Sequence, residues 1–410
     1  MSETAGIPVR QQGMRDHNLG VVLRTVADGE GVSRAEVAAA TGLTKATVSS
    51  LVDELARHSL IIEAGPAGNS VGRPGQALRL NPDGPVGIGV EINVDYLACC
   101  VLDLSGRPRH QAVSLADNRD RPVAEVLAEA AGLVESALDA AKAASLPAAG
   151  VVAAVPGLVR TAEGLLASAP NLGWTQVPVV DELARPGWPR VSVENEANLA
   201  ALGELWFGEP AGADQHRADF IHVSGEIGIG AGVVVGGELF RGRNGFAGEL
   251  GHVTVRPDGP VCGCGARGCL EAIAGQEAIL RAAGLPPNTG TTLATPAGPL
   301  ARLVERAEAG DARAVGAVRT AGEALGVALA GMVNLLDLDA VLLGGMFALL
   351  APWLREPVQA ELTERVLGAR WTEPRVEVSK LGWEAAVRGA AGSVVNRIVQ
   401  NPADHMRRSA

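Results

Sequence analysis

Apolar residues recur at intervals of three and four positions in three stretches near the N-terminus, which predicts three amphipathic helices. The first stretch, within "HNLGVVLRTVADGE", places its apolar face on Leu19, Val22, Leu23 and Val26. The second is short and turns Val37 and Ala38 inward. The third places its apolar face on Val48, Leu51, Val52 and Leu55. We therefore expect a small three-helix unit ahead of the main body.

The ends of these helices carry capping signals. Ser33 and Glu36 stand at the spacing of a capping box, so the second helix is expected to begin just after Ser33. Gly42 should end it, because the tight turn that follows requires a positive φ, and Thr44 is a suitable N-cap for the third helix. The positions that match helix-turn-helix spacing are Ala38, Gly42, Val48 and Leu51. A small residue there lets the helices approach, glycine makes the turn, and two apolar residues dock the second helix on the first.

Two short apolar segments, "LIIEA" and "QALRLNP", follow this unit and are separated by the glycine-rich loop "GPAGNSVGRPG". They predict the two strands of a wing. Short donors near the start of the third helix suit phosphates and base edges, and an arginine on a narrow backbone in the loop suits a minor groove. The candidate DNA-binding residues are Thr44, Lys45, Thr47, Ser49, Ser50 and Arg73. The alternative is an ordinary helical hairpin with a solvated face, which the wing pattern disfavours.

From Pro85 onward, apolar strand-like runs alternate with amphipathic helical stretches, so the main body is predicted to be α/β. Examples are "VGIGVEINVDYLACCVLDLSG", "AAGVVAAVPGLV" and "FIHVSGEIGIGAGVVVGGELFRG". Glycines recur at the ends of these strands, where a backbone approaches a ligand closely. The backbone is therefore expected to approach a ligand closely at the strand ends.

The segment "GHVTVRPDGPVCGCGARGCLE" concentrates three of the five cysteines of the chain. Cys262, Cys264 and Cys269 supply three thiolates and His252 an imidazole, the donor set of a structural zinc site. The glycines between them leave the backbone free to wrap a small ion. The alternative is a loop of reduced free thiols. The other two cysteines, Cys99 and Cys100, lie in an apolar stretch and are expected in the core.

The order of these pieces, and above all "ELGHVTV" followed by "CGCGARGCLE", resembles the ROK family of repressors, open reading frames and kinases. The resemblance covers essentially the whole chain, and the helix-turn-helix is similar to that of the transcriptional regulators in the family. It implies a two-lobed, actin-like, hexokinase-type α/β fold that binds a sugar in its cleft, and zinc at the four positions above. The expected domains are a winged helix-turn-helix at 1–82, a first lobe at 83–195 plus 385–400, and a second lobe with the zinc site at 196–384.

Carboxylates flank the metal motif. Zinc would fix His252 and bring Glu249 and Glu271 to one wall of the cleft, where carboxylates accept pairs of hydroxyl protons from sugars. In ROK sugar binders the matching positions contact the hydroxyls, and the resemblance places Asn195 and Glu196 on the opposite wall. A single acidic residue of this kind is more often a solvated surface group. The joint match to one set of family motifs favours a sugar site.

The sequence departs from ROK kinases where phosphate chemistry is needed. The first phosphate loop of those kinases reads Asp-x-Gly-Gly-Thr-Lys, but here Val94 adds bulk and Asp95 adds negative charge. In the second loop Glu226, Ile227 and Gly228 stand where the family has Gly-Thr-Gly, so the threonine hydroxyl is lost and a second carboxylate appears. The family's catalytic aspartate is Glu196 here. An extra methylene moves the carboxylate by on the order of 1 Å, which can cost about a hundredfold in rate. We therefore expect no enzyme activity.

Composition and charge narrow the class of protein. The chain is 47% hydrophobic and 20% charged, which is ordinary for a globular protein. Its net charge of -11 argues against a body that binds nucleic acid non-specifically, but leaves room for a small DNA-binding head. No long unbroken apolar run and no signal-peptide pattern is present, so no membrane span is expected and the predicted location is cytoplasmic. Cysteines are then reduced, which favours metal binding over disulfides.

These observations lead to one functional hypothesis and two alternatives. The hypothesis is a sugar-responsive transcriptional regulator, most often a repressor in this family, that binds operator DNA and responds to a sugar or sugar derivative. Because a helix-turn-helix dimer reads two half-sites, a homodimer or homotetramer is expected. The stiff segment "LRLNPDGP" would pass lobe rotation to the heads. The alternatives are an active ATP-dependent sugar kinase with a DNA-binding head, and a regulator controlled by a docking protein partner.

Overall fold

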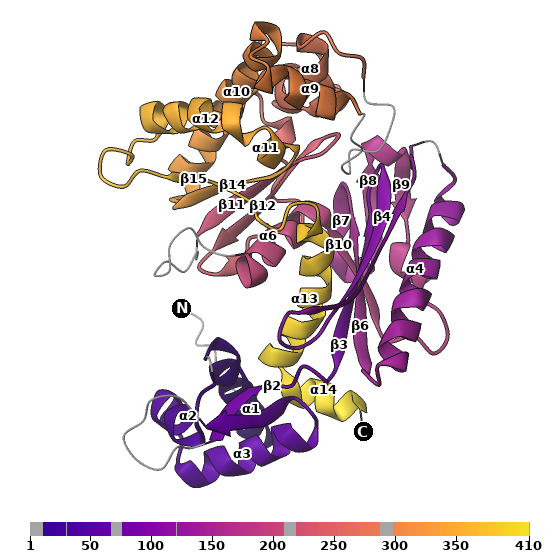
Figure 1. Ribbon diagram of the computed structural model, residues 1–410, viewed down its shortest axis with the longest axis vertical. Coiled ribbons are helices and arrows are strands. Elements are labelled where there is room, and N and C mark those ends of the chain that lie inside the picture. The colour runs from indigo at the N-terminus through magenta and orange to yellow at the C-terminus, as the bar shows by residue number, and fades with distance from the viewer. Residues whose placement is uncertain are drawn as a thin grey trace, which may run out of the picture.

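The computed structural model describes residues 11–29, 31–66, 76–119, 121–208, 219–287 and 298–409 (Figure 1). The chain begins with a head of three helices and a two-stranded antiparallel sheet. Its elements are α1 (Gln11–Asp28), α2 (Arg34–Thr41), α3 (Lys45–Arg57), β1 (Ile61–Pro66) and β2 (Gln76–Leu80). The pattern of helix-turn-helix and wing predicted from the sequence is present in this order.

The caps of the head helices form as the sequence predicts. The Ser33 side chain accepts a hydrogen bond from the Glu36 N–H, and the Glu36 carboxylate accepts one from the Ser33 N–H. Gly42 follows α2 with φ 70°, and the Thr44 hydroxyl caps α3 by accepting from the Thr47 N–H. The apolar faces of the three helices meet in one buried cluster. Local capping and burial therefore both favour the observed packing.

The first lobe is built on a five-stranded sheet in the order β10-β6-β3-β4-β5. Its strands are β3 (Val86–Ile92), β4 (Tyr96–Leu102), β5 (Pro108–Leu115), β6 (Ala148–Val155) and β10 (Val191–Asn195). The helix α4 (Val123–Ala143) covers one face, with α5 (Val179–Leu183) nearby. A small sheet joins β7 (Leu158–Arg160), β8 (Leu165–Ala169) and β9 (Trp174–Val177). β3 is buried along its whole length, as expected of a central strand covered on both faces.

The second lobe carries another five-stranded sheet, in the order β13-β12-β11-β14-β15. Its strands are β11 (Phe220–Gly225), β12 (Ile229–Val235), β13 (Glu238–Leu239), β14 (Ala340–Gly345) and β15 (Arg375–Val378). Its helices are α7 (Glu271–Ala274), α8 (Gln276–Ala282), α9 (Pro299–Glu308), α10 (Ala312–Leu336), α11 (Met346–Leu349) and α12 (Ala351–Arg365). The apolar sides of these helices pack on the sheet around one large core.

Two helices from distant parts of the chain cross between the lobes. α6 (Glu196–Phe207) directly follows β10, and α13 (Glu384–Gln400) comes from the C-terminal region and runs along β3 (Figure 1). Gly87 and Gly89 of β3 lie so close to the α13 backbone that a Cβ at either position would overlap it. This close approach holds α13 against the sheet of the first lobe.

The head is joined to the body by more than the chain segment between β2 and β3. Leu19 and Leu23 of α1 share a buried cluster with Cys100 of β4, Val395 of α13 and Met406 of the last helix, α14 (Pro402–Ser409). The prediction that the "LRLNPDGP" segment connects head and body is therefore incomplete, because this shared core connects them as well. Cys99 and Cys100 are both buried, as predicted.

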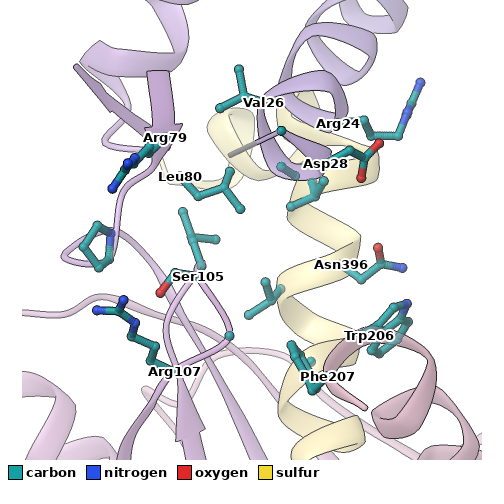
Figure 2. Close-up of a pocket in the computed structure, with 18 of the residues that line it drawn as sticks. Arg24, Val26, Asp28, Arg79, Leu80, Ser105, Arg107, Trp206, Phe207 and Asn396 are labelled. Atoms are coloured by element: carbon teal, nitrogen blue, oxygen red, sulfur yellow. The ribbon is translucent and has the colours of Figure 1, made fainter. Parts of the chain in front are cut away.

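Polar contacts and a cavity complete the joint between head and body. The Arg24 guanidinium donates to the Gln400 side-chain oxygen at 3.0 Å, and Arg407 pairs with Asp16 at 2.9 Å. A cavity of about 530 Å³ lies between the head, the first lobe and α13. Figure 2 shows Arg79 and Arg107 on one side of this cavity and Trp206, Phe207 and Asn396 on the other. Within the described residues, no helix is long and apolar enough to span a bilayer.

Candidate functional site

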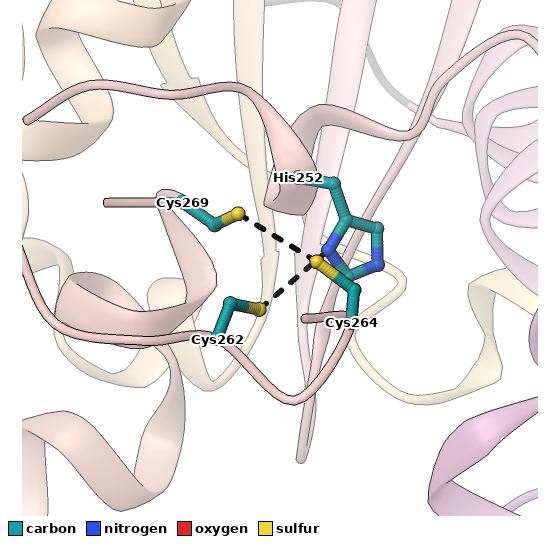
Figure 3. Close-up of side chains that lie close together, drawn as sticks. All are labelled: His252, Cys262, Cys264 and Cys269. Carbon is teal, nitrogen blue, oxygen red and sulfur yellow. Dashed lines mark hydrogen bonds between the residues drawn. The ribbon is translucent and has the colours of Figure 1, made fainter. Parts of the chain in front are cut away.

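One histidine and three cysteines converge in the second lobe (Figure 3). His252 ends a short 3-10 turn at Leu250–His252, and the three cysteines lie on the loop before α7. Their ligand atoms all lie within 4.8 Å of one another. The loop folds back on itself through hydrogen bonds such as that from the Cys262 N–H to the Ala266 carbonyl at 2.8 Å. Gly268 adopts φ 73°, and a Cβ there would overlap the Arg256 carbonyl. The structure thus brings together all four predicted ligands.

The spacing of the four ligand atoms fits a tetrahedral metal ion. Two thiolates bound to zinc at about 2.3 Å lie about 3.8 Å apart in a tetrahedron. The Cys264 and Cys269 Sγ atoms are 3.8 Å apart, and Cys262 Sγ is 3.8 Å from His252 Nδ1. The other ring nitrogen, Nε2, points toward Glu249, whose Oε2 lies 3.9 Å away. The cluster can therefore hold a metal ion through Nδ1 and leave Nε2 for a neighbouring carboxylate.

A cleft of about 500 Å³ runs between the lobes beside this cluster. It lies where β3, β6, β10 and β11 end, the position at which open α/β sheets bind ligands. All five residues predicted to bind a sugar line it, namely Asn195, Glu196, Glu249, His252 and Glu271. Of the described residues in its lining, none is a lysine or an arginine. The described part of the cleft therefore offers hydrogen-bond acceptors and no lysine or arginine.

Two of the predicted sugar-binding residues also have structural roles. The Asn195 oxygen caps α6 by accepting from the Asn198 N–H at 3.0 Å, while its amide donates to the Gly157 carbonyl at 2.9 Å. Glu271 accepts a hydrogen bond from the Ile229 N–H at 3.1 Å. These contacts fix both side chains at the cleft before any ligand binds.

Several carboxyl groups of the cleft and its inner end have raised pKa values. Burial raises the pKa of Glu226 well above its usual value, and the nearby Asp95, Glu91 and Glu196 raise it further. Burial also raises the pKa of Glu196 in the same way, and that of Glu91 to about 7. Glu249 has a raised pKa for the same reason, partly opposed by His252. The un-ionised forms can donate as well as accept hydrogen bonds.

The loops that would hold phosphate in a kinase carry these same acidic groups. Val94 is buried, and the Tyr96 hydroxyl donates to the Glu91 carboxyl at 2.6 Å. In the turn between β11 and β12 the Glu226 N–H donates to the Gly228 carbonyl at 3.0 Å. A triphosphate at the inner end of the cleft would need hydrogen-bond donors and cations. This end of the cleft instead presents an apolar side chain and carboxyl groups.

Sequence reasoning missed part of the cleft lining. Ser168 and Asn171, from β8 and the turn after it, line the cleft beside Gly228. A Cβ at Gly228 would crowd the Asn171 amide and the Glu271 carboxylate, so the glycine keeps these two groups close. No motif marks Asn171, because its place in the cleft depends on how the small three-stranded sheet packs.

The predicted DNA-binding residues lie mostly on the exposed start of α3. Thr44, Lys45 and Ser50 are exposed, and Thr47 and Ser49 are partly buried. The Thr44 and Thr47 hydroxyls bond each other at 2.8 Å, so one donor of this pair is already used within the helix cap. Arg73 lies outside the described residues.

Fold and site together define a two-lobed α/β protein of the actin-like, hexokinase type that carries a winged helix-turn-helix head. A sequence model of the ROK family matches residues 87–396. The chain belongs to the ROK family, and the resemblance seen in its motifs is confirmed.

Individual relatives include both regulators and kinases. A putative xylose repressor from Caldicellulosiruptor sp. (strain Rt8B.4) is 32% identical over 93% of this chain and 96% of its own length. A glucokinase from Thermotoga maritima is 34% identical but covers only 55% of this chain and 72% of its own length. A crystal structure described as a ROK family transcriptional regulator, a homolog of the E. coli MLC protein, superposes with TM-score 0.78 over 96% of this chain and 98% of its own at 24% identity. That likeness confirms the predicted fold class.

Proposed function

We propose that this protein is a sugar-responsive transcriptional repressor. The observation that carries the proposal is that one chain joins a winged helix-turn-helix head to a cleft with candidate sugar-binding residues on both walls. A relative that is similar over nearly the full length, head included, is named a putative xylose repressor. The glucokinase is similar over about half of the chain. A function as a repressor explains why the chain carries a DNA-binding head, and a function as a kinase alone does not.

The proposed effector is an unphosphorylated sugar, with D-xylose as the first candidate. Glu249, His252 and Glu271 would hold hydroxyl groups from one wall, and Asn195 and Glu196 from the other. A sugar phosphate would bring negative charge to a lining in which the described residues supply carboxyl groups and no lysine or arginine.

Zinc is the metal proposed for the four-residue cluster. Three cysteines and one histidine would complete a tetrahedron without an open position, which is the form of a structural zinc site. When bound, zinc would hold the loop that carries Glu249, His252 and Glu271, so its role is to keep one wall of the sugar cleft in place.

In the proposed DNA complex, α3 contacts operator DNA through Thr44, Lys45, Thr47, Ser49 and Ser50, and Arg73 of the wing loop reaches a minor groove. Two copies of the chain would present two heads to two half-sites. A homodimer, or a tetramer built from such dimers, is therefore part of the proposal.

The head is proposed to follow the movements of the first lobe, because α13 connects the two as well as the segment between β2 and β3. Trp383, just before α13, packs edge-on against Tyr96 beside the buried carboxyl groups, with ring centres 6.5 Å apart. At the C-terminal end of α13, Gln400 accepts a hydrogen bond from Arg24 of the head. A single helix thus links the inner end of the cleft to the DNA-binding domain.

We propose that the chain does not transfer phosphate, because the groups that would meet a triphosphate are carboxyl groups.

The test of the proposed function starts with an operator selected from genomic fragments by the purified protein. Fluorescence anisotropy then measures operator affinity in the presence of D-xylose, D-xylose 5-phosphate, D-glucose or D-glucose 6-phosphate. A coupled assay measures ATP-dependent phosphorylation of the two free sugars. The proposal expects one unphosphorylated sugar to change operator affinity about 5- to 150-fold. No response to any sugar, or turnover near 1 per second, which is in the ordinary enzyme range, would refute it.

A further inference from the structure

Two thiols of the metal cluster are shielded by the fold, and the third is accessible. Cys262 and Cys269 are buried, at 5% and 0% exposure, whereas Cys264 is exposed. Cys264 and the adjacent Gly263 belong to the lining of the sugar cleft, next to His252. One thiol of the cluster is therefore reached from the cleft, and the other two are shielded by the fold.

The exposed thiol has a partner at short range. Cys264 Sγ lies 3.8 Å from Cys269 Sγ, and a disulfide requires about 2.05 Å, so a movement of about 2 Å would join them. The segment between them contains Gly265 and Gly268, both with positive φ, and a Cβ at Gly265 would meet nothing nearby. The loop around Cys264 therefore has space to make this movement.

The remaining described cysteines do not share this environment. Cys99 and Cys100 lie side by side on β4, buried in the sheet of the first lobe. Burial raises the pKa of both thiols to about 12, so they are protected from oxidants by position and by protonation. They provide internal controls within the same chain.

We propose that the cluster is an oxidation-sensitive modification site which peroxide reaches through the sugar cleft, so that a bound sugar protects it. This inference rests on the proposed zinc and sugar sites. A sugar held by Glu249, His252 and Glu271 would occupy the space in front of Cys264, because all four residues line the same cleft. Sugar binding and oxidation then exclude each other.

The chemistry consumes one hydrogen peroxide per cluster. The Cys264 thiolate attacks the peroxide: an S–O bond forms, the O–O bond breaks, and the leaving hydroxide takes a proton from solvent to become water. The Cys269 thiolate then attacks Cys264 Sγ: the S–S bond forms, the S–O bond breaks, and a second hydroxide leaves as water after protonation. Two thiolates are oxidised by two electrons in total, and the peroxide is reduced to two waters.

Oxidation would remove two of the four metal ligands. The ion would keep only His252 and Cys262 and would be released, because the affinity of such a site depends on its complete ligand set. The wall that holds Glu249 and Glu271 would then lose its support. The oxidised protein is therefore expected to lose sugar affinity, so that oxidant and sugar act in opposite directions on the same repressor.

The experiment uses the full-length, reduced protein and needs no variant of the cluster itself. Zinc content and D-xylose affinity are measured first, by elemental analysis and calorimetry. A lack of zinc or of sugar binding refutes the proposed function and this inference with it. With both present, excess hydrogen peroxide is added and zinc release is followed with a chromogenic chelator, without sugar, with D-xylose, and with L-xylose as the matched control.

The expected result is protection by D-xylose alone. At twenty times its Kd the open fraction of the cleft falls about 20-fold, so zinc release should slow by about that factor. Peptide mass spectrometry should find a Cys264–Cys269 disulfide and reduced Cys99 and Cys100, and in the E249Q variant D-xylose should protect less. Equal release rates with D-xylose and L-xylose, or zinc loss without modification of Cys264, would overturn the inference while leaving the zinc and sugar sites standing.

Discussion

Glu249→Gln is the substitution that tests whether the cleft senses the sugar. Glutamine has nearly the volume of glutamate, so the change removes a charge and leaves the packing intact. Glu249 is not one of the four metal ligands, and its carboxylate is 3.9 Å from His252 Nε2. Zinc content is therefore expected to stay at one ion per chain, which separates this variant from any change at His252.

The size of the effect follows from the hydrogen bonds that Glu249 would make. A hydrogen bond to a charged group contributes about 1.5–3 kcal/mol and a neutral one about 0.5–1.5 kcal/mol. The loss of about 1–2 kcal/mol corresponds to a Kd for the sugar that is about 5- to 30-fold weaker. The sugar concentration for half of the operator response should rise by the same factor, because binding and response are linked.

The assay measures operator binding by fluorescence anisotropy over a series of sugar concentrations. Glu238→Gln is the matched control, because Glu238 is an exposed glutamate of the same lobe on β13, outside the cleft lining. It should respond as the wild type does. If E249Q also responds at the wild-type sugar concentration, the cleft is not the sensor, and control by a docking protein becomes the better explanation.

Three further predictions address the metal, the DNA and the buried carboxyl groups. Cys264→Ser should lower zinc content below one per chain and destabilise the second lobe; a normal zinc content by elemental analysis would contradict the proposed ligand set. Operator affinity should fall steeply between 50 and 200 mM salt, and Lys45→Ala should reduce the slope of log K against log salt by about 1; an unchanged slope would remove Lys45 from the DNA contact. Because the pKa of Glu91 is raised to about 7, the folded protein binds a proton that the unfolded chain has lost, so stability should fall as pH rises from about 4.5 to 7. Glu91→Gln should flatten this part of the melting profile, and an equally steep profile would show that other groups cause it.

The parts of the structure that could be predicted from the sequence are those determined by residues near one another in the chain. The capping box of Ser33 and Glu36 and the turn at Gly42 depend on neighbours within one or two helical turns. The four candidate metal ligands lie within one short segment, so spacing and donor type suffice to identify the cluster. The same reasoning overlooked a conflict at Thr44, whose hydroxyl caps α3 and is therefore already engaged in the head itself.

The parts that could not be predicted depend on contacts between distant segments. Asn171 reaches the cleft only because β8 packs near the turn between β11 and β12, and no local pattern reports that packing. The carboxyl groups of Glu91 and Glu226 are buried where the two lobes meet. Glu226 was identified from the sequence, but the raised pKa values of both groups were not. The shared core of the head with α13 and α14 joins the two ends of the chain and likewise leaves no sequence signal.

That shared core restricts how a sugar can act on DNA. α13 lies against the β3 backbone at Gly87 and Gly89, and the head packs on α13 and α14, so head and first lobe are expected to move as one unit. Closure of the cleft then moves the second lobe relative to that unit and does not by itself turn the head. In a dimer held together through first lobes, the distance between the two heads would stay the same whether or not sugar is bound. A sugar can change that distance only if the second lobe takes part in the contact between subunits. Movement of the second lobe then shifts the first lobe and head of one subunit relative to those of its partner.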